Sequence, residues 1–285
     1  KALYSNTGGT DITGVGSNCL RDNTSGTENV AMGSASLLSN TTGSYNTAIG
    51  RSALRTNTTA SSNTAVGYQA GYNNTTGTDL VAIGSGAAFN QTTSAGNIAV
   101  GQNALYSNTT GVGNTALGTQ HTSVSNSCLY ANTTGSYNTA VGTSAMRTNT
   151  TGSYNTAQGY QALYSNTTAS NNTAVGYQAG YSNQTNTNLT FLGYQAGYNT
   201  TADSNTMLGY QAGYRNTTGA RNVFIGDNAG NGTVGQSAGD DICIGYRTMW
   251  NLSSGAYNVA IGTQAMYSVS TGASNIAVGY QAGYS

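Results

Sequence analysis

The 285-residue sequence predicts an all-β protein, a parallel β-solenoid or β-roll of about sixteen 17-residue coils. Three observations predict this fold. A short motif, of which Asn63–Gly67 is one copy, recurs sixteen times, and its glycine returns mostly at intervals of 17 residues. The residues before that glycine alternate between β-branched and small side chains, as in a strand. No segment has the period of an amphipathic helix, and the chain holds 40 Gly and no Pro.

The first element of each coil is a strand at the three residues before the motif glycine, such as residues 64–66. The side chains of Thr64 and Val66 share one face of this strand, whereas Ala65 points to the other face. The column of Thr64 holds Thr in some coils and Val or Ile in others. We therefore expect this column to face the interior and the alanine column to face outward.

The second element follows the glycine and is predicted to be another short strand, at residues 68–72 of the same coil. Its fourth position alternates between glycine and a large apolar residue, as at Gly71 and Leu105. The rest of each coil has a turn composition, close to Asn-Thr-Thr-Gly-Ser-Tyr. One column of turn glycines is predicted to need a positive φ: Gly43, Gly77, Gly111, Gly135 and Gly152.

Two columns of asparagine predict hydrogen bonds between successive coils, because identical amides one coil apart can donate and accept along the stack. The structural ladder before the strands includes Asn46, Asn63, Asn97, Asn114, Asn138, Asn155 and Asn172. The turn column includes Asn23, Asn40, Asn57, Asn74, Asn108, Asn132, Asn149, Asn166 and Asn216. These amides are expected to replace part of the core, since Leu, Val, Ile and Phe together number only 40.

The repeat covers nearly the whole chain, so residues 1–285 are predicted to form a single repeat array. Two irregular intervals mark insertions, one of seven residues at 119–125 and one of two residues within 227–244. The sequence begins and stops inside repeats. We therefore expect it to be a segment of a longer chain.

Composition argues against most other function classes. Eight basic and eight acidic residues give a formal net charge of zero, so the chain lacks the excess of positive charge that is typical of nucleic-acid-binding proteins. No apolar run reaches the roughly 20 residues of a membrane-spanning helix. Three cysteines without a close pair and a single histidine provide no metal-binding or disulfide pattern. We therefore expect no catalytic, cofactor-binding or metal site, and no enzyme.

Isolated reactive side chains have simple structural interpretations. Cys19, Cys128 and Cys243 lie in alanine columns and are expected to be small buried thiols. His121 lies in the longer insertion and is expected to be an exposed loop residue. Asp240 and Asp241 are the one adjacent acidic pair, and they are expected to lie in an exposed turn because no third carboxylate is near them.

Tyrosines in register form the remaining candidate site. One column, a candidate for receptor contact or for an interface ladder, comprises Tyr68, Tyr160, Tyr177, Tyr194, Tyr210 and Tyr280. Their rings and hydroxyls could bind sugars. The favoured interpretation is that the rings stack on one another or seal a subunit interface.

The repeats resemble the head repeats of trimeric autotransporter adhesins. The motifs that carry this resemblance are Asn258–Gly262 and Leu80–Gly84, and a later column holds small residues such as Ala70 and Ala87. The repeats are also similar to those of bacteriophage tail-fibre proteins. The resemblance covers nearly the whole chain and implies a left-handed β-roll that forms a homotrimer. The period is longer than the usual one of adhesin heads, and residues 1–285 consist of the repeats without the stalk, anchor or chaperone domain of these families.

A physical reason for oligomers is the expected outward alanine face. Burial of this face against sister chains would stabilise the assembly by about 25 cal/mol per Å². Larger residues interrupt the column, and a rod with this face at a threefold axis is expected to thicken or repack there. They are Phe191, Met207, Phe224 and Cys243.

The predicted function is an extracellular structural and adhesive fibre segment on a bacterial cell surface or a virion tail. It would be a rigid rod for attachment to a surface or receptor. Its expected partners are further copies of itself and a cell-surface glycan or receptor, with no nucleic acid and no membrane span in this segment. The alternative is an ice-binding or self-assembling extracellular filament solenoid, but ice binding needs an outward threonine face. A glycan-processing β-helix enzyme is disfavoured because the eight acidic residues are scattered.

Overall fold

The computed structural model describes residues 1–118, 127–233 and 235–284. The chain is all-β and forms a parallel solenoid, in which each coil contributes one strand of three residues and the rest of the coil consists of turns. The chain divides into two compact units, Lys1–Thr151 and Gly152–Ser285. The predicted solenoid is thereby confirmed, and each unit is described in turn.

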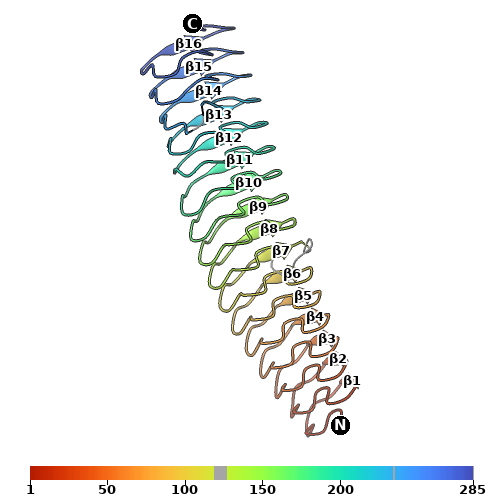
Figure 1. The fold of residues 1–285 in the computed structure, drawn as a ribbon. Coiled ribbons are helices and arrows are strands. Elements are labelled where there is room, and N and C mark those ends of the chain that lie inside the picture. The colour runs from red at the N-terminus through yellow and green to blue at the C-terminus, as the bar shows by residue number, and fades with distance from the viewer. Residues whose placement is uncertain (119–126, 234, 285) are drawn as a thin grey trace. The chain divides into compact units, whose positions relative to one another are not determined.

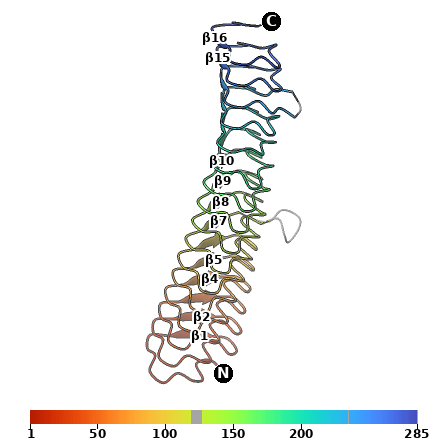
Figure 2. The ribbon, with the colours of Figure 1, turned by 90° about the vertical axis from the view of Figure 1, so that its left-hand side faces the viewer.

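The N-terminal unit stacks its strands in chain order, as Figure 1 shows, and Figure 2 shows the turns of this unit lying one above another. Every described pair is parallel and in register, so Thr47 pairs with Thr64, and Ala48 with Ala65. The strands are β1 (Thr13–Val15), β2 (Val30–Met32), β3 (Thr47–Ile49), β4 (Thr64–Val66), β5 (Val81–Ile83), β6 (Ile98–Val100), β7 (Thr115–Leu117) and β8 (Thr139–Val141).

The C-terminal unit repeats this arrangement. Its strands are β9 (Thr156–Gln158), β10 (Thr173–Val175), β11 (Thr190–Leu192), β12 (Thr206–Leu208), β13 (Val223–Ile225), β14 (Ile242–Ile244), β15 (Val259–Ile261) and β16 (Ile276–Val278). The register survives both irregular intervals of this unit, since Thr190 pairs with Thr206 and Val223 pairs with Ile242. Extra or missing residues are thus absorbed in the turns.

The two faces of the strands are reversed relative to the expectation from sequence. The central strand residue is fully buried, as at Ala48 and Ala65, whereas Thr47 is half-buried and Ile49 is exposed. The alanine column therefore faces the interior and the threonine column faces outward, so both predicted orientations were wrong. Each coil is narrow, and its interior admits only a small residue from the strand when a large residue enters from the opposite side.

The opposite side is the segment that follows the motif glycine. Leu54 and Leu105, at its fourth position, are fully buried in coils whose strand residue is alanine. Where that position is glycine, the strand residue can be larger, as at Phe191. A Cβ on Gly197 would overlap the ring of Phe191. The large strand residues therefore fill the interior of their own unit, and the expectation that they break an outward face was wrong.

The segment after the motif glycine is a series of turns, so the predicted second strand was wrong. Its backbone enters the left-handed region at Gln69 (φ 56°) and again at Gly71 (φ 59°), which is incompatible with a strand. Its backbone groups still pair between coils: the Leu54 N–H donates to the Ala70 carbonyl at 3.0 Å, and the Gln69 N–H donates to the Arg51 carbonyl at 3.0 Å. This side of the coil is therefore also hydrogen-bonded along the stack.

The turn glycines are needed for close approach, and the predicted positive φ was wrong at Gly43, Gly77 and Gly111. A Cβ on Gly43 would overlap the carbonyl oxygen of Ala60 in the next coil. The motif glycines, in contrast, have a positive φ, such as 128° at Gly50. A side chain there is disfavoured both by the backbone conformation and by the adjacent coil.

Candidate functional site

The three cysteines are buried free thiols, as predicted. Burial raises the pKa of the Cys128 thiol to about 12, and burial also raises the pKa of Cys19 and Cys243. No three His, Cys, Asp or Glu side chains among the described residues are grouped so that they could hold a metal ion. His121 and the insertion at 119–125 lie outside the described residues.

The acidic pair separates into two different environments, and the prediction of an exposed turn was wrong for Asp241. Asp240 pairs with Arg221, whose Nε donates to its Oδ1 at 2.6 Å. Asp241 is fully buried and occupies the asparagine column before the strands. Its Oδ1 accepts from the Asn258 backbone N–H at 2.8 Å, but its Oδ2 has no hydrogen-bond partner. Burial raises the pKa of the Asp241 carboxyl to about 6.

Asparagines of both columns hydrogen-bond between coils. In the column before the strands, the Asn46 Nδ2 donates to the Asn29 Oδ1 at 3.1 Å, and the Asn63 backbone N–H donates to the Asn46 Oδ1 at 3.1 Å. In the turn column, the Asn57 Nδ2 donates to the Asn40 Oδ1 at 2.7 Å. The asparagines of the predicted structural ladder are all buried. They act as packed interior groups and are not accessible to a ligand.

The first and third residues of each strand form an uncharged surface, which we call the outward strand face. Its first column holds Thr, Val or Ile, and its third column holds Val, Ile, Leu, Met or, at residue 158, Gln. Ile83 and Leu192 are 40% and 47% exposed. No strand of the described residues carries a charged side chain. This face is therefore uncharged and open in both units, with a mostly apolar third column beside a first column that is threonine in nine of the sixteen strands.

Four of the predicted tyrosines come together in the C-terminal unit, in what we call the outer ladder. Tyr160, Tyr177, Tyr194 and Tyr210 stack with ring centroids 5.1 to 5.3 Å apart. They are exposed, so the ring edges and hydroxyls face solvent. The two other predicted tyrosines lie elsewhere, Tyr68 in the N-terminal unit and Tyr280 in the last coil.

The residues directly after the motif glycines form what we call the outer column, to which the outer ladder and Tyr68 belong. A half-buried inner row of aromatic residues accompanies this outer column. In the C-terminal unit, Tyr164, Tyr181, Tyr198 and Tyr214 stack at 5.0 to 5.2 Å. In the N-terminal unit the row is Tyr72, Phe89, Tyr106 and Tyr130, at 5.0 to 5.3 Å. The positions of Phe89 and Trp250 in this row, and of Tyr246 in the outer column, were not predicted. Their common distance from the motif glycine is the signal that could have found them.

A row of glutamine amides lies between the two tyrosine columns in the sequence and hydrogen-bonds along the coils. The Gln178 Nε2 donates to the Gln161 Oε1 at 2.8 Å, and the Gln195 Nε2 donates to the Gln178 Oε1 at 2.9 Å. One N–H of each donating amide is used in these bonds. Amides and phenols thus share this surface, which carries no charge within the segments 160–164, 177–181 and 194–198.

The N-terminal unit has a hollow of about 300 Å³ between the same two columns, which we call the Tyr68 hollow. Its lining includes Tyr68, Gln69, Ser85, Phe89, Asn103 and Tyr106. It lies where the outer column has a serine in place of a tyrosine. On the preceding coil, the Arg51 guanidinium lies 5.9 Å from the Tyr68 ring centroid. Aromatic rings and uncharged polar groups therefore line this hollow.

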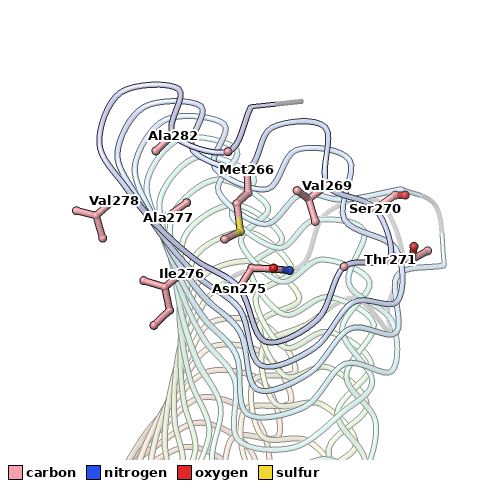
Figure 3. Close-up of a pocket in the computed structure, with 11 residues that line it drawn as sticks. Met266, Val269, Ser270, Thr271, Asn275, Ile276, Ala277, Val278 and Ala282 are labelled. Atoms are coloured by element: carbon pink, nitrogen blue, oxygen red, sulfur yellow. The ribbon is translucent and has the colours of Figure 1, made fainter.

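A larger cavity, of about 630 Å³, lies at the last coil. In Figure 3, Met266 and Ala277 point into the coil, whereas Ile276 and Val278 point away from it. This cavity is the core of the solenoid, with no further coil over it among the described residues. It carries no convergent polar chemistry, but it shows directly which strand residues face inward.

Comparison with known proteins finds no protein-family model that matches the chain, and no curated protein is similar to it. The described part of the chain also holds no helix with the length and apolar character needed to cross a membrane. The surfaces that remain for function are the outward strand face, the outer ladder and the Tyr68 hollow.

Proposed function

We propose that this chain is a structural and adhesive segment of an extracellular fibre, whose solenoid units associate with copies of themselves through the outward strand face. The observation that carries this proposal is the uncharged, largely apolar character of that face in both units. A bacterial cell surface or a virion tail is the proposed location, in line with the resemblance of the repeats. The rod would hold a binding surface for a glycan or receptor, and association of several copies would favour avidity.

The size of the outward strand face supports self-association. Eight strands at about 4.8 Å and three residues at about 3.3 Å give a strip of roughly 400 Å² in each unit. A contiguous, largely apolar patch of this size on a monomer is commonly an interaction site. The mostly apolar third column makes up roughly half of this strip, so its burial at about 25 cal/mol per Å² would contribute on the order of 5 kcal/mol per unit before the costs of association.

A homotrimer is the assembly we propose. Each unit presents a narrow strip, and a closed symmetric assembly buries such strips without leaving an open end. Three strips facing a common axis would form an apolar core outside the individual solenoids. The interface is then made by residues such as Val81 and Ile83, and the alanine column stays inside each chain.

The decisive experiment is light scattering on the full chain and on two single variants. We expect the unmodified protein to have three times the mass of one chain. Ile83→Lys should dissociate it, because a lysine ammonium cannot be buried unpaired at low cost. Thr76→Lys, at an exposed turn, is the matched control and should leave the mass unchanged. A monomeric unmodified protein would overturn the proposed assembly.

Ice binding is a second candidate, favoured by one observation. The threonine column faces outward, contrary to the expectation that had counted against this function. In the C-terminal unit, Thr156, Thr173, Thr190 and Thr206 lie in successive strands. The adjacent column varies between Gln158, Val175 and Leu192, so the face is uneven, and for this reason we rank ice binding second. Thermal hysteresis that Thr173→Lys abolishes would reverse the ranking.

A further inference from the structure

The Tyr68 hollow differs from the outer ladder in the use of the tyrosine ring faces. Within the ladder, Tyr177 stacks on Tyr160 at 5.3 Å and on Tyr194 at 5.1 Å, so both faces of its ring are covered. Tyr68 is followed in its column by Ser85. Because no ring lies on the next coil, one face of the Tyr68 ring borders the hollow.

The other face of the Tyr68 ring is backed by a cation. The Arg51 guanidinium lies 5.9 Å from the ring centroid, on the coil that precedes Tyr68. This contact favours the orientation in which the opposite face of the ring is open to a ligand. The rings of Phe89 and Tyr106, which stack at 5.1 Å, add an aromatic wall to the hollow.

The polar groups of the hollow are amides and one hydroxyl. Gln69, Ser85 and Asn103 line it. A side chain on Gly86 would overlap the Asn103 Oδ1, so the glycine makes room for this amide beside the aromatic wall. Among the residues that the structure describes, no acidic or basic side chain lines the hollow. The chemistry therefore fits an uncharged ligand with several hydroxyl groups and one flat apolar face.

A sugar ring has this combination. Its C–H face can pack on an aromatic ring, and its hydroxyls can donate to and accept from amides. The volume of about 300 Å³ is at the lower end of the roughly 300–1,000 Å³ of small-molecule sites. This size fits a short piece of a glycan. A phosphate or carboxylate group would find no cation among the lining residues.

We infer that the Tyr68 hollow binds a neutral glycan, with one pyranose ring packed on the open face of Tyr68 and its hydroxyls hydrogen-bonded to Gln69 and Asn103. This inference rests on the proposed adhesive function and names its ligand class. Glycan binding is thereby assigned to the Tyr68 hollow alone, where a ring face is open. The stacked outer ladder is expected to bind no glycan.

Saturation-transfer NMR and calorimetry on the full chain test the inference, with lactose, cellobiose and N,N′-diacetylchitobiose as probes. We expect at least one of these sugars to bind. Tyr68→Ala should weaken its binding roughly tenfold or more. Ser85→Tyr should do the same by filling the hollow with a ring, and it should fold, because tyrosine occupies this column in successive coils of the outer ladder. Tyr177→Ala is the matched control and should bind normally.

The inference is overturned if none of the three sugars binds, if Ser85→Tyr and Tyr68→Ala bind as tightly as the unmodified chain, or if Tyr177→Ala weakens binding as much as Tyr68→Ala. Light scattering on the same samples separates this result from the proposed assembly. A monomer that binds sugar would support glycan binding in the Tyr68 hollow and refute the trimer. A trimer that binds no sugar would support the assembly and refute glycan binding.

Discussion

Two coils, one from each unit, fill the same kind of interior in opposite ways. In the N-terminal unit, β3 places Ala48 inside the coil, and Leu54 enters from the opposite turn. In the C-terminal unit, β11 places Phe191 inside, and the opposite turn has Gly197. The side chains of Ala48, Leu54 and Phe191 are all completely buried. The backbone register is the same in both regions, so the interior volume is set by the pair of positions together.

The comparison teaches that neither column can be interpreted alone. A left-handed φ occurs at the fourth turn position whether the residue is leucine, as at Leu54 (φ 47°), or glycine, as at Gly197 (φ 60°). Glycine is therefore not required there by conformation. At Gly197 it is required by the size of the strand residue Phe191, whose ring would collide with any side chain at this position.

The largest expected effect is on Phe191. Phe191→Ala leaves a cavity and should lower the free energy of unfolding by about 3–5 kcal/mol. Gly197→Leu alone should also destabilise, because its Cβ would overlap the Phe191 ring. The double variant recreates the alanine and leucine pair of the N-terminal unit, so it should recover most of the loss. Urea denaturation measures all three variants, and a double variant as unstable as Phe191→Ala would break the comparison.

Asp241 provides a second contrast between the units, since the same column in the N-terminal unit has asparagines such as Asn46. The folded pKa of about 6 lies above the usual value of 3.8, so the folded state binds the proton more tightly than the unfolded state. The contribution of the Asp241 carboxyl to the free energy of unfolding is therefore fully present below about pH 4 and is lost as the pH rises through 6.

Asp241→Asn should remove this loss and stabilise the protein by about 3 kcal/mol above pH 7, with no difference from the unmodified chain below about pH 4. Denaturation curves at several pH values measure the effect. Asn46→Asp is the mirror control and should introduce the same pH dependence in the N-terminal unit. A gain from Asp241→Asn that is equal at pH 4 and pH 8 would contradict this account.

A smaller difference is expected between two turn asparagines. Asn57 donates to Asn40 at 2.7 Å and to the Ala60 carbonyl at 3.0 Å, so it links coils as well as its own turn. The side-chain hydrogen bonds of Asn216 stay within its own turn, to Gly219. Asn57→Ala should therefore cost about 1 kcal/mol more than Asn216→Ala in a denaturation experiment. Equal costs would show that the amide ladder between coils contributes nothing.

The smallest expected effect is the reaction of the thiols. Cys128 in the N-terminal unit and Cys243 in the C-terminal unit come from opposite sides of the coil, yet both are buried with raised pKa values. A thiol-specific reagent should therefore label neither of them in the native protein at neutral pH, and should label both in urea. Rapid native labelling of Cys243 alone would indicate that the coils around it open locally.

Much of the fold could be predicted from the sequence because the repeat fixes it. The strand at residues 64–66 and the parallel register follow from the position of the motif glycine, and the structure has β4 at these residues. The orientation of the strand could not be obtained in the same way. The expectation that Val and Ile lie inside ignored the leucine at Leu54 or Leu105, which already fills the coil.

The candidate sites were predictable only in part. Equal spacing predicts that Tyr160 and Tyr177 stack. The Tyr68 hollow depends instead on a break in the column at Ser85, which a search for repetition passes over. The position of Asp241 was obscured in the same way, because a two-residue insertion shifts it relative to the column it belongs to.

The register of β7 and β8 has a practical consequence. Thr115 pairs with Thr139, although seven more residues separate them than separate most neighbouring strands. The connection after Gly118 can therefore lengthen without any change in the pairing of the strands on either side. A foreign peptide grafted at this connection would therefore leave the strand pairing of the scaffold unchanged.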